Sequence, residues 1–122
     1  MNKQFLISLV ICTSLLTACT RKEDGLLVIR NETPMYLVGK TYTKDSLNLQ
    51  DNFGVSPNDK LVLSRYHITR REQTQYLRQL VQLQLQSNNC VIYLDEKEIA
   101  DLATGGPNIV IHIKMELFDN CN

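Results

Sequence analysis

Cysteine and histidine are the residue types through which this chain could carry nucleophilic, redox or metal chemistry. It has four cysteines and two histidines, His67 and His112. Each histidine lies in a stretch that reads as a strand, at a position that can face solvent, with no neighbouring ligand pattern for a metal. The signatures of serine hydrolases, phosphate-binding loops and zinc proteases do not occur in the sequence. We therefore expect a protein that is not an enzyme and that uses no metal or other cofactor.

A cluster of four carboxylates is the other candidate for chemistry. Asp95, Glu96, Glu98 and Asp101 lie at the start of a predicted helix. Acid–base catalysis needs two carboxyl groups whose pKa values are pushed apart. Ionised acids are expected at a helix start because they interact favourably with the helix dipole. We interpret the cluster as part of the helix and not as a catalytic pair.

The first 18 residues have the organisation of a secretory signal peptide. Lys3 precedes an apolar run over residues 5–16, which as a helix is about 18 Å long and too short for a hydrocarbon core of ~30 Å. The run ends in Leu16-Thr17-Ala18-Cys19, which resembles the lipobox of bacterial lipoproteins. The resemblance implies cleavage before Cys19, acylation of Cys19, and membrane binding through the lipid. Thr20 stands where an Asp would imply retention at the inner membrane, so the outer membrane is expected, with the protein facing the periplasm.

The mature chain is expected to be a lipidated tether, residues 19–25, followed by one domain over residues 26–122. One domain suits this length. Within the tether, Lys22-Glu23-Asp24 is similar to the acidic export signal of some surface lipoproteins. That similarity implies an alternative, a surface-exposed accessory lipoprotein.

Two cysteines remain once Cys12 is removed with the signal and Cys19 carries lipid. These are Cys90 and Cys121, and in an oxidising compartment such a pair normally forms a disulfide. Closing the loop over residues 90–121 would stabilise the fold by about 3.5–4 kcal/mol. A metal pair or a redox motif is the alternative, although the spacing matches neither CxxC nor a Cys/His zinc cluster.

Hydrophobic patterning predicts four strands, over residues 26–29, 35–42, 61–68 and 109–117. The last is the strongest, because apolar and mostly polar residues alternate strictly along it. The first two are separated by a short Asn/Pro turn and are expected to form an antiparallel hairpin. In the polar stretch between residues 43 and 60, Leu47 and Leu49 mark a possible short strand, and residues 52–54 and 56–59 read as turns.

Two helices are predicted, over residues 70–86 and 95–104. Thr69 and Glu72 have the spacing of a capping box, and glycines follow the second helix. Residues 81–86 also alternate with period two, so an alternative is a strand that pairs through residues 87–89 with residues 90–94. The expected fold class is α+β, a small and mainly antiparallel sheet with one or two helices packed on one face and one disulfide.

The charge is unevenly distributed although the chain has 13 basic and 13 acidic residues. This balance argues against nucleic-acid binding, which requires a basic surface. Residues 19–78 carry ten basic and seven acidic residues, while residues 79–122 carry two and six. Arg65, Arg70, Arg71 and Arg78 are expected to form a basic patch, which is either a solvated face or a surface for anionic lipid or an acidic partner.

The order of elements downstream of residue 76 resembles the disulfide-linked α/β pilotins of type II secretion systems. The similarity covers a helix over residues 76–86, Cys90, a short helix ending in glycine, the strand from residue 109, and Cys121. It implies a non-enzymatic accessory role in an envelope complex, with an apolar groove for a secretin helix. The groove residues would be Leu77, Val81, Ile109 and Ile111. A periplasmic inhibitor or immunity module that uses residues 52–60 as its binding loop is the alternative.

Overall fold

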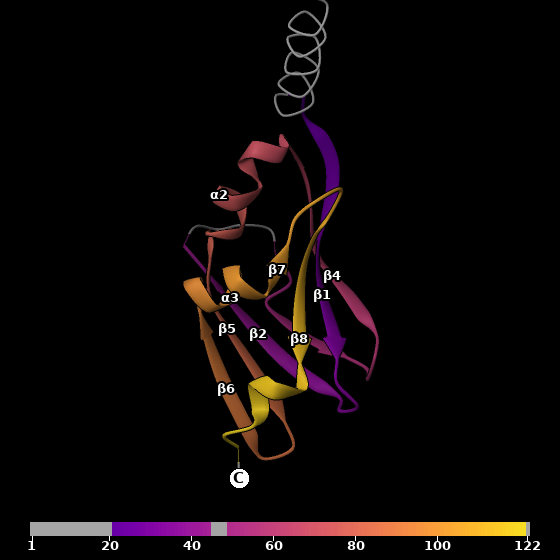
Figure 1. Cartoon of the computed structure of the whole chain (residues 1–122), viewed down its shortest axis with the longest axis vertical. Helices are drawn as coiled ribbons and strands as arrows, with labels where there is room; N and C mark the ends of the chain where they lie inside the picture. The colour runs from indigo at the N-terminus through magenta and orange to yellow at the C-terminus, as the bar shows by residue number, and fades with distance from the viewer. Residues whose placement is uncertain (1–20, 45–48, 122) are drawn as a thin grey trace, which may run out of the picture.

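The strands form two four-stranded sheets around one core (Figure 1). The computed structural model describes residues 21–44 and 49–121. The first sheet has the order β4 (Lys60–Ile68), β1 (Glu23–Glu32), β8 (Ile109–Lys114) and β7 (Ala103–Thr104). The second has the order β3 (Asn52–Val55), β2 (Leu37–Thr43), β5 (Leu80–Ser87) and β6 (Cys90–Asp95). The predicted signal peptide, Cys19 and Leu47 lie outside the described residues.

The first sheet is built around β1, which pairs antiparallel with β4 and parallel with β8. β1 is longer than the predicted strand over residues 26–29, and it includes residues 23–25, which we expected in the tether. In β8 the alternation predicts the burial correctly, since Ile109, Ile111 and Ile113 all lie in the core. The strand ends at Lys114 instead of residue 117, because the 3-10 helix η2 (Met115–Phe118) begins there.

The predicted hairpin between the first two strands is wrong, because β1 and β2 belong to different sheets. β2 pairs with β3 and β5. Residues 52–54, predicted as a turn, are part of β3 instead. Phe53 is buried and its ring lies directly over Gly39 of β2, where a Cβ atom would come within 2.0 Å of the ring. A glycine is therefore needed at residue 39 for β3 to pair with β2.

The predicted helix over residues 70–86 is wrong beyond residue 77, and the alternative strand is present. The 3-10 helix η1 (Arg70–Glu72) and the short helix α2 (Gln73–Leu77) are followed by β5. β5 pairs with β6 through the turn at residues 87–90, as the alternative required. Leu83 and Leu85 would lie about 200° apart on a helix, but on a strand they share one face. Both are fully buried, so the hydrophobic core favours the strand over helix propensity.

Two capping boxes determine where the helical segments begin. The Thr69 side chain accepts a hydrogen bond from the Glu72 backbone N–H, and the Glu72 side chain accepts one from the Thr69 backbone. Asp95 and Glu98 make the same reciprocal pair at the start of α3 (Glu96–Leu102). The predicted helix over residues 95–104 is therefore present but ends at Leu102, because residues 103–104 form β7. The expected place of the acidic residues at a helix start is confirmed, and the capping box of Asp95 adds to it.

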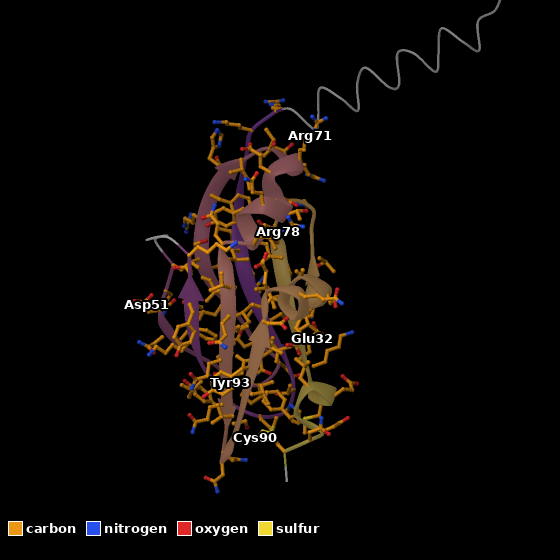
Figure 2. The ribbon with its side chains drawn as sticks, turned by 90° about the vertical axis from the view of Figure 1, so that its left-hand side faces the viewer. Glu32, Asp51, Arg71, Arg78, Cys90 and Tyr93 are labelled. Atoms are coloured by element: carbon orange, nitrogen blue, oxygen red, sulfur yellow. A yellow bond between two sulfur atoms is a disulfide. The ribbon has the colours of Figure 1, made fainter. Side chains whose placement is uncertain are left out.

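One core joins the two sheets, and a disulfide fastens the end of the chain to it. Leu27, Ile29 and Ile111 of the first sheet share the core with Leu83 and Leu85 of the second. Cys90 and Cys121 form the predicted disulfide, with 5.6 Å between their Cα atoms, at the end of the domain opposite residue 21 (Figures 1 and 2). The α+β fold class, the mainly antiparallel pairing and the disulfide are thus confirmed, with the strands divided between two sheets.

Candidate functional site

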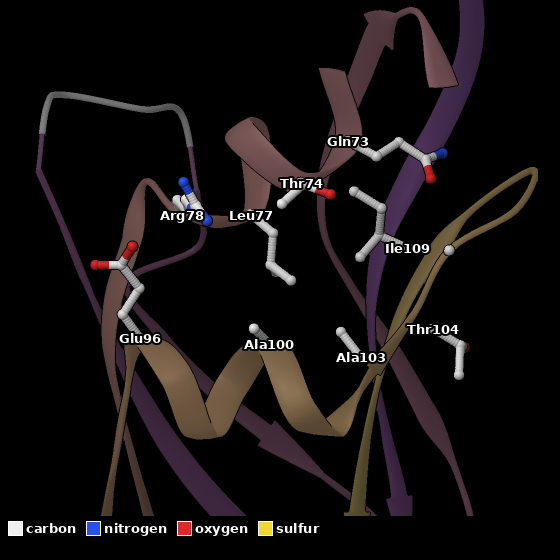
Figure 3. A pocket seen from close by; sticks show the side chains of 10 residues that line it. Gln73, Thr74, Leu77, Arg78, Glu96, Ala100, Ala103, Thr104 and Ile109 are labelled. Atoms are coloured by element: carbon white, nitrogen blue, oxygen red, sulfur yellow. The ribbon is translucent and has the colours of Figure 1, made fainter. Parts of the chain in front are cut away.

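A small cleft with an apolar floor lies between α2 and α3 (Figure 3). Its volume is about 160 Å³. Leu77 points into it from α2, Ala100 and Ala103 from the α3 side, and Ile109 from the start of β8. Gln73, Thr74, Arg78, Glu96 and Thr104 supply a polar rim. The combination of an apolar floor and a polar rim makes this cleft a candidate binding site.

Two tyrosines hold α2 against β4 and so set the upper wall of the cleft. The Tyr76 hydroxyl of α2 lies 2.6 Å from the Ser64 hydroxyl of β4. The rings of Tyr66 and Tyr76 are 5.0 Å apart and tilted by 57°, an arrangement that aromatic pairs favour. Burial raises the pKa of the Tyr66 phenol above its ordinary value, so this group stays neutral. Because the second half of the predicted helix is a strand, these contacts are what fix the five-residue α2.

A glutamine clamp closes the side of the cleft next to the β7–β8 loop. The Gln73 amide donates to the Gly106 carbonyl at 2.6 Å, and its oxygen accepts from the Gly106 N–H at 3.3 Å. Gly106 has a φ of +138°, a conformation that glycine adopts far more readily than other residues. Gln73 thus links two segments that are 33 residues apart in the sequence.

Opposite charges lie together on the other side of the cleft. Arg78 follows the last residue of α2, and Glu96 is the first residue of α3 (Figure 3). The Lys44 ammonium lies 3.9 Å from the Glu96 carboxylate. Side chains on this rim can therefore form an ion pair with either an anionic or a cationic group of a bound molecule.

The structure brings together only part of the predicted groove. Leu77 and Ile109 both line the cleft. Ile111 is fully buried in the core, and Val81 is half-buried in β5. Neither residue lines the cleft. Val81 lies on β5 because the helical segment ends at residue 77, and Ile111 is on the predicted strand but faces the core.

The four arginines do not form one patch. Arg70 and Arg71 are exposed in η1, near residue 21. Arg78 lies on the cleft rim, and Arg65 lines a separate depression with Asp24 and Asn108. The predicted patch residues are therefore distributed over β4, η1 and the end of α2, with Arg65 and Arg78 at two different depressions.

The outer face of the second sheet exposes large apolar side chains, a feature that the sequence reading missed. Cross-strand pairing places Val38, Gln86 and Val91 in one row, and Lys40, Gln84 and Tyr93 in the next. Tyr93 is 57% exposed. We call this surface the outer face; it comprises Tyr36, Val38, Tyr42, Val91 and Tyr93 with the glutamines of β5. The alternation of Leu and Gln in β5 was the signal for it, and the preference for a helix hid that signal.

A second feature missed in the sequence is a chain of hydrogen bonds through His112. Its Nδ1 contacts the Glu32 carboxylate, and its Nε2 lies 2.9 Å from the Thr104 hydroxyl. A hydroxyl, an imidazole and a carboxylate in this order resemble a nucleophile with its base. His112 and Glu32 do not line the cleft, however. The contacts instead tie β7 and β8 to the end of β1, and parallel pairing of β1 with β8 explains how residues 32 and 112 meet.

Replacing Gln73 by Ala tests the clamp. Without its amide, Gly106 loses both partners, and we expect about 1 kcal/mol lower stability together with faster amide hydrogen exchange in the β7–β8 loop. Gln75→Ala, an exposed position on the same helix, is the matched control. Equal exchange rates at Gly105, Gly106 and Asn108 in the two variants would contradict the clamp.

Replacing Glu32 by Gln tests the His112 contact through its pH dependence. The hydrogen bond from His112 lowers the pKa of Glu32, with smaller help from Arg30 and Lys114 and against an opposing effect of burial. A lowered pKa in the folded state stabilises the fold above the pKa of the unfolded chain, near 4.5. We expect the variant to be about 0.5–1 kcal/mol less stable at pH 6.5 in urea titrations, and the difference to shrink as the pH falls below about 4.5.

The control for this experiment is Glu116→Gln, an exposed carboxylate on η2. It should change stability little at any pH. A Glu32→Gln difference that stays constant between pH 6.5 and 3.5 would contradict the assigned contact.

The described residues show no other chemical signature. None of their helices has the length and apolar character needed to cross a membrane, and residues 21–44 and 49–121 contain no cluster of three or more potential metal ligands. Comparison of the chain with protein-family models, with curated proteins and with solved structures gave no match. The function of the chain has to be inferred from its own residues and their arrangement.

Proposed function

We propose that the chain is a non-enzymatic lipoprotein of the outer membrane that binds a protein partner in an envelope complex. The signal-peptide pattern and the Leu16-Thr17-Ala18-Cys19 motif support the anchor. The Cys90–Cys121 disulfide supports an oxidising compartment, because such bonds are rare in the cytosol. The domain faces the periplasm in this proposal.

The size and lining of the α2–α3 cleft carry the proposal of a protein partner. Pockets for small organic ligands usually measure about 300–1,000 Å³, whereas this cleft measures about 160 Å³. That volume suits one large apolar side chain. A single apolar anchor in a pocket with a polar rim is the usual centre of a protein–protein interface.

The outer face supplies the area that the cleft alone lacks. A stable interface buries about 800 Å² on each partner. Tyr42, Gln82 and Asp95 form the last cross-strand row of the outer face, and Asp95 directly precedes Glu96 on the cleft rim. The cleft and the outer face therefore adjoin at the β6–α3 junction. We propose that one partner covers both.

The pilotin resemblance proposes a secretin subunit as this partner. The helix that this resemblance requires over residues 76–86 is mostly the strand β5 in this fold. The proposal therefore retains only Leu77 and Ile109 of the four predicted groove residues. The inhibitor alternative uses residues 52–60, which comprise β3 of the second sheet and the turn that leads into β4. It predicts a soluble enzyme as the partner. In the surface-exposed alternative, the domain lies on the outer side of the outer membrane, and the proposed binding site on the domain is the same.

Photo-crosslinking from the cleft tests the proposal. A photoreactive phenylalanine replaces Thr74, an exposed residue on the rim, in the full chain expressed in its native host. We expect one major adduct with a subunit of an envelope membrane complex. Ala100→Trp, which fills the cleft, should reduce this adduct at least tenfold, since loss of a central contact typically exceeds 1.4 kcal/mol.

Asp101→Trp is the matched control, because it adds the same side chain one residue further along α3, outside the cleft lining. Both tryptophan variants should retain the disulfide and the thermal midpoint of the parent chain. An adduct that persists equally in both variants would exclude the cleft as the binding site. A soluble periplasmic enzyme in the adduct would favour the inhibitor alternative.

A further inference from the structure

Four basic residues gather at the end of the domain where the described chain begins. Arg21 and Lys22 precede β1, and Arg70 and Arg71 follow β4, whose last residue pairs with the first of β1. We call this surface, formed by Arg21, Lys22, Arg70 and Arg71, the basic end. All four residues are exposed. Figure 2 places Arg71 at the opposite end of the domain from Cys90.

The acidic residues at this end are already engaged. The Glu23 carboxylate lies 3.5 Å from the Arg70 guanidinium, and the Asp24 carboxylate lies 2.9 Å from the His67 imidazole. The Glu72 carboxylate accepts a hydrogen bond from the Thr69 backbone. Among the described residues, Arg21, Lys22 and Arg71 form no ion pair at salt-bridge distance. Hydrogen bonds with Thr69 lower the pKa of the Glu72 carboxyl group, and the Lys22 ammonium is near enough to lower it further. The four basic residues outnumber the three acidic residues, Glu23, Asp24 and Glu72, by one, so this end keeps a net positive charge for an external anion.

The short tether determines which anion these residues meet. Arg21 is two positions after Cys19, with only Thr20 between them, so its Cα atom lies within about 7 Å of the Cys19 Cα atom even when the chain is fully extended. An acyl group on Cys19 therefore holds the basic end within the headgroup layer. That distance is within the Debye length of about 8 Å at physiological salt, so charges in the membrane surface act on Arg21. The ion pair between Glu23 and Arg70 places η1 beside the same end of β1.

We propose that the basic end binds anionic phospholipid headgroups and so orients the domain on the membrane. This inference rests on the lipid anchor of the proposed function. Each basic residue near an anionic surface increases binding about fivefold. Docking directs β1 away from the membrane, so that the disulfide end lies about 33 Å further out. Arg78 and Arg65 belong to other surfaces and take no part.

Tryptophan quenching tests the orientation, because the chain contains no natural tryptophan. The acylated protein carrying Arg71→Trp is reconstituted into two kinds of vesicle. One kind contains brominated phosphatidylcholine alone, and the other also contains about 30% phosphatidylglycerol, an anionic lipid. We expect strong quenching only with phosphatidylglycerol, and weaker quenching at high salt. Tyr93→Trp, an exposed position far from the basic end, should show little quenching in either vesicle.

Neutralising Arg21, Lys22 and Arg70 to Gln in the Arg71→Trp chain should lower the docked-to-undocked ratio about a hundredfold. Quenching that is equal in both vesicles, or unchanged by the three substitutions, would overturn the headgroup site. Flotation of the same samples separates the two proposals. A chain that floats with the vesicles without charge-dependent quenching keeps the anchor and loses the headgroup site, whereas a chain that does not float loses the anchor.

Discussion

The buried side chain of Asn31 is the constraint on which the two-sheet arrangement depends. It is completely inaccessible to solvent. Its amide donates to the carbonyls of Met35, Val55 and Ser56, and its oxygen accepts from the backbone N–H and the hydroxyl of Thr33. An unpaired amide in this position would destabilise the fold by about 1–3 kcal/mol. The described residues contain no buried side-chain nitrogen or oxygen without a partner.

This network directs the chain from the first sheet into the second. Asn31 lies near the end of β1, Met35 lies just before β2, and Val55 ends β3. The same residues that look like a hairpin turn therefore connect two sheets instead of two paired strands. At the other end of β1, Glu23 and Gly25 pair with the end of β4, which positions η1 and α2. The cleft and the basic end thus occupy one half of the molecule, and the Asn31 network and the disulfide occupy the other.

The sequence predicts those features of the fold that depend on residues close together in the chain. The alternation in β8, the capping box of Thr69, the acidic start of α3 and the Cys90–Cys121 pair could be read without knowledge of distant contacts. The strand that contains Leu83 and Leu85 could not be predicted in this way. The capped helix start at Thr69 favours a helix and the period-two alternation favours a strand, and burial of both leucines against the first sheet decides for the strand. Phe53 was assigned to a turn because its packing over Gly39 is a tertiary contact. The same holds for the candidate site. Leu77 and Ile109 are predicted from the sequence, whereas the Gln73 clamp, the outer face and the His112 contacts depend on residues that are distant in sequence.

The proposed lipid anchor on Cys19 is the premise for the proposed compartment, for the oxidising environment of the cysteines and for the end of the domain that would meet the membrane. Mass spectrometry of the protein extracted from membranes of its native host tests it directly. Tryptic digestion should release the peptide Cys19-Thr20-Arg21 as the N-terminus, with acyl chains on Cys19. An unmodified Cys19, or a mature chain that begins at any other residue, would contradict the account.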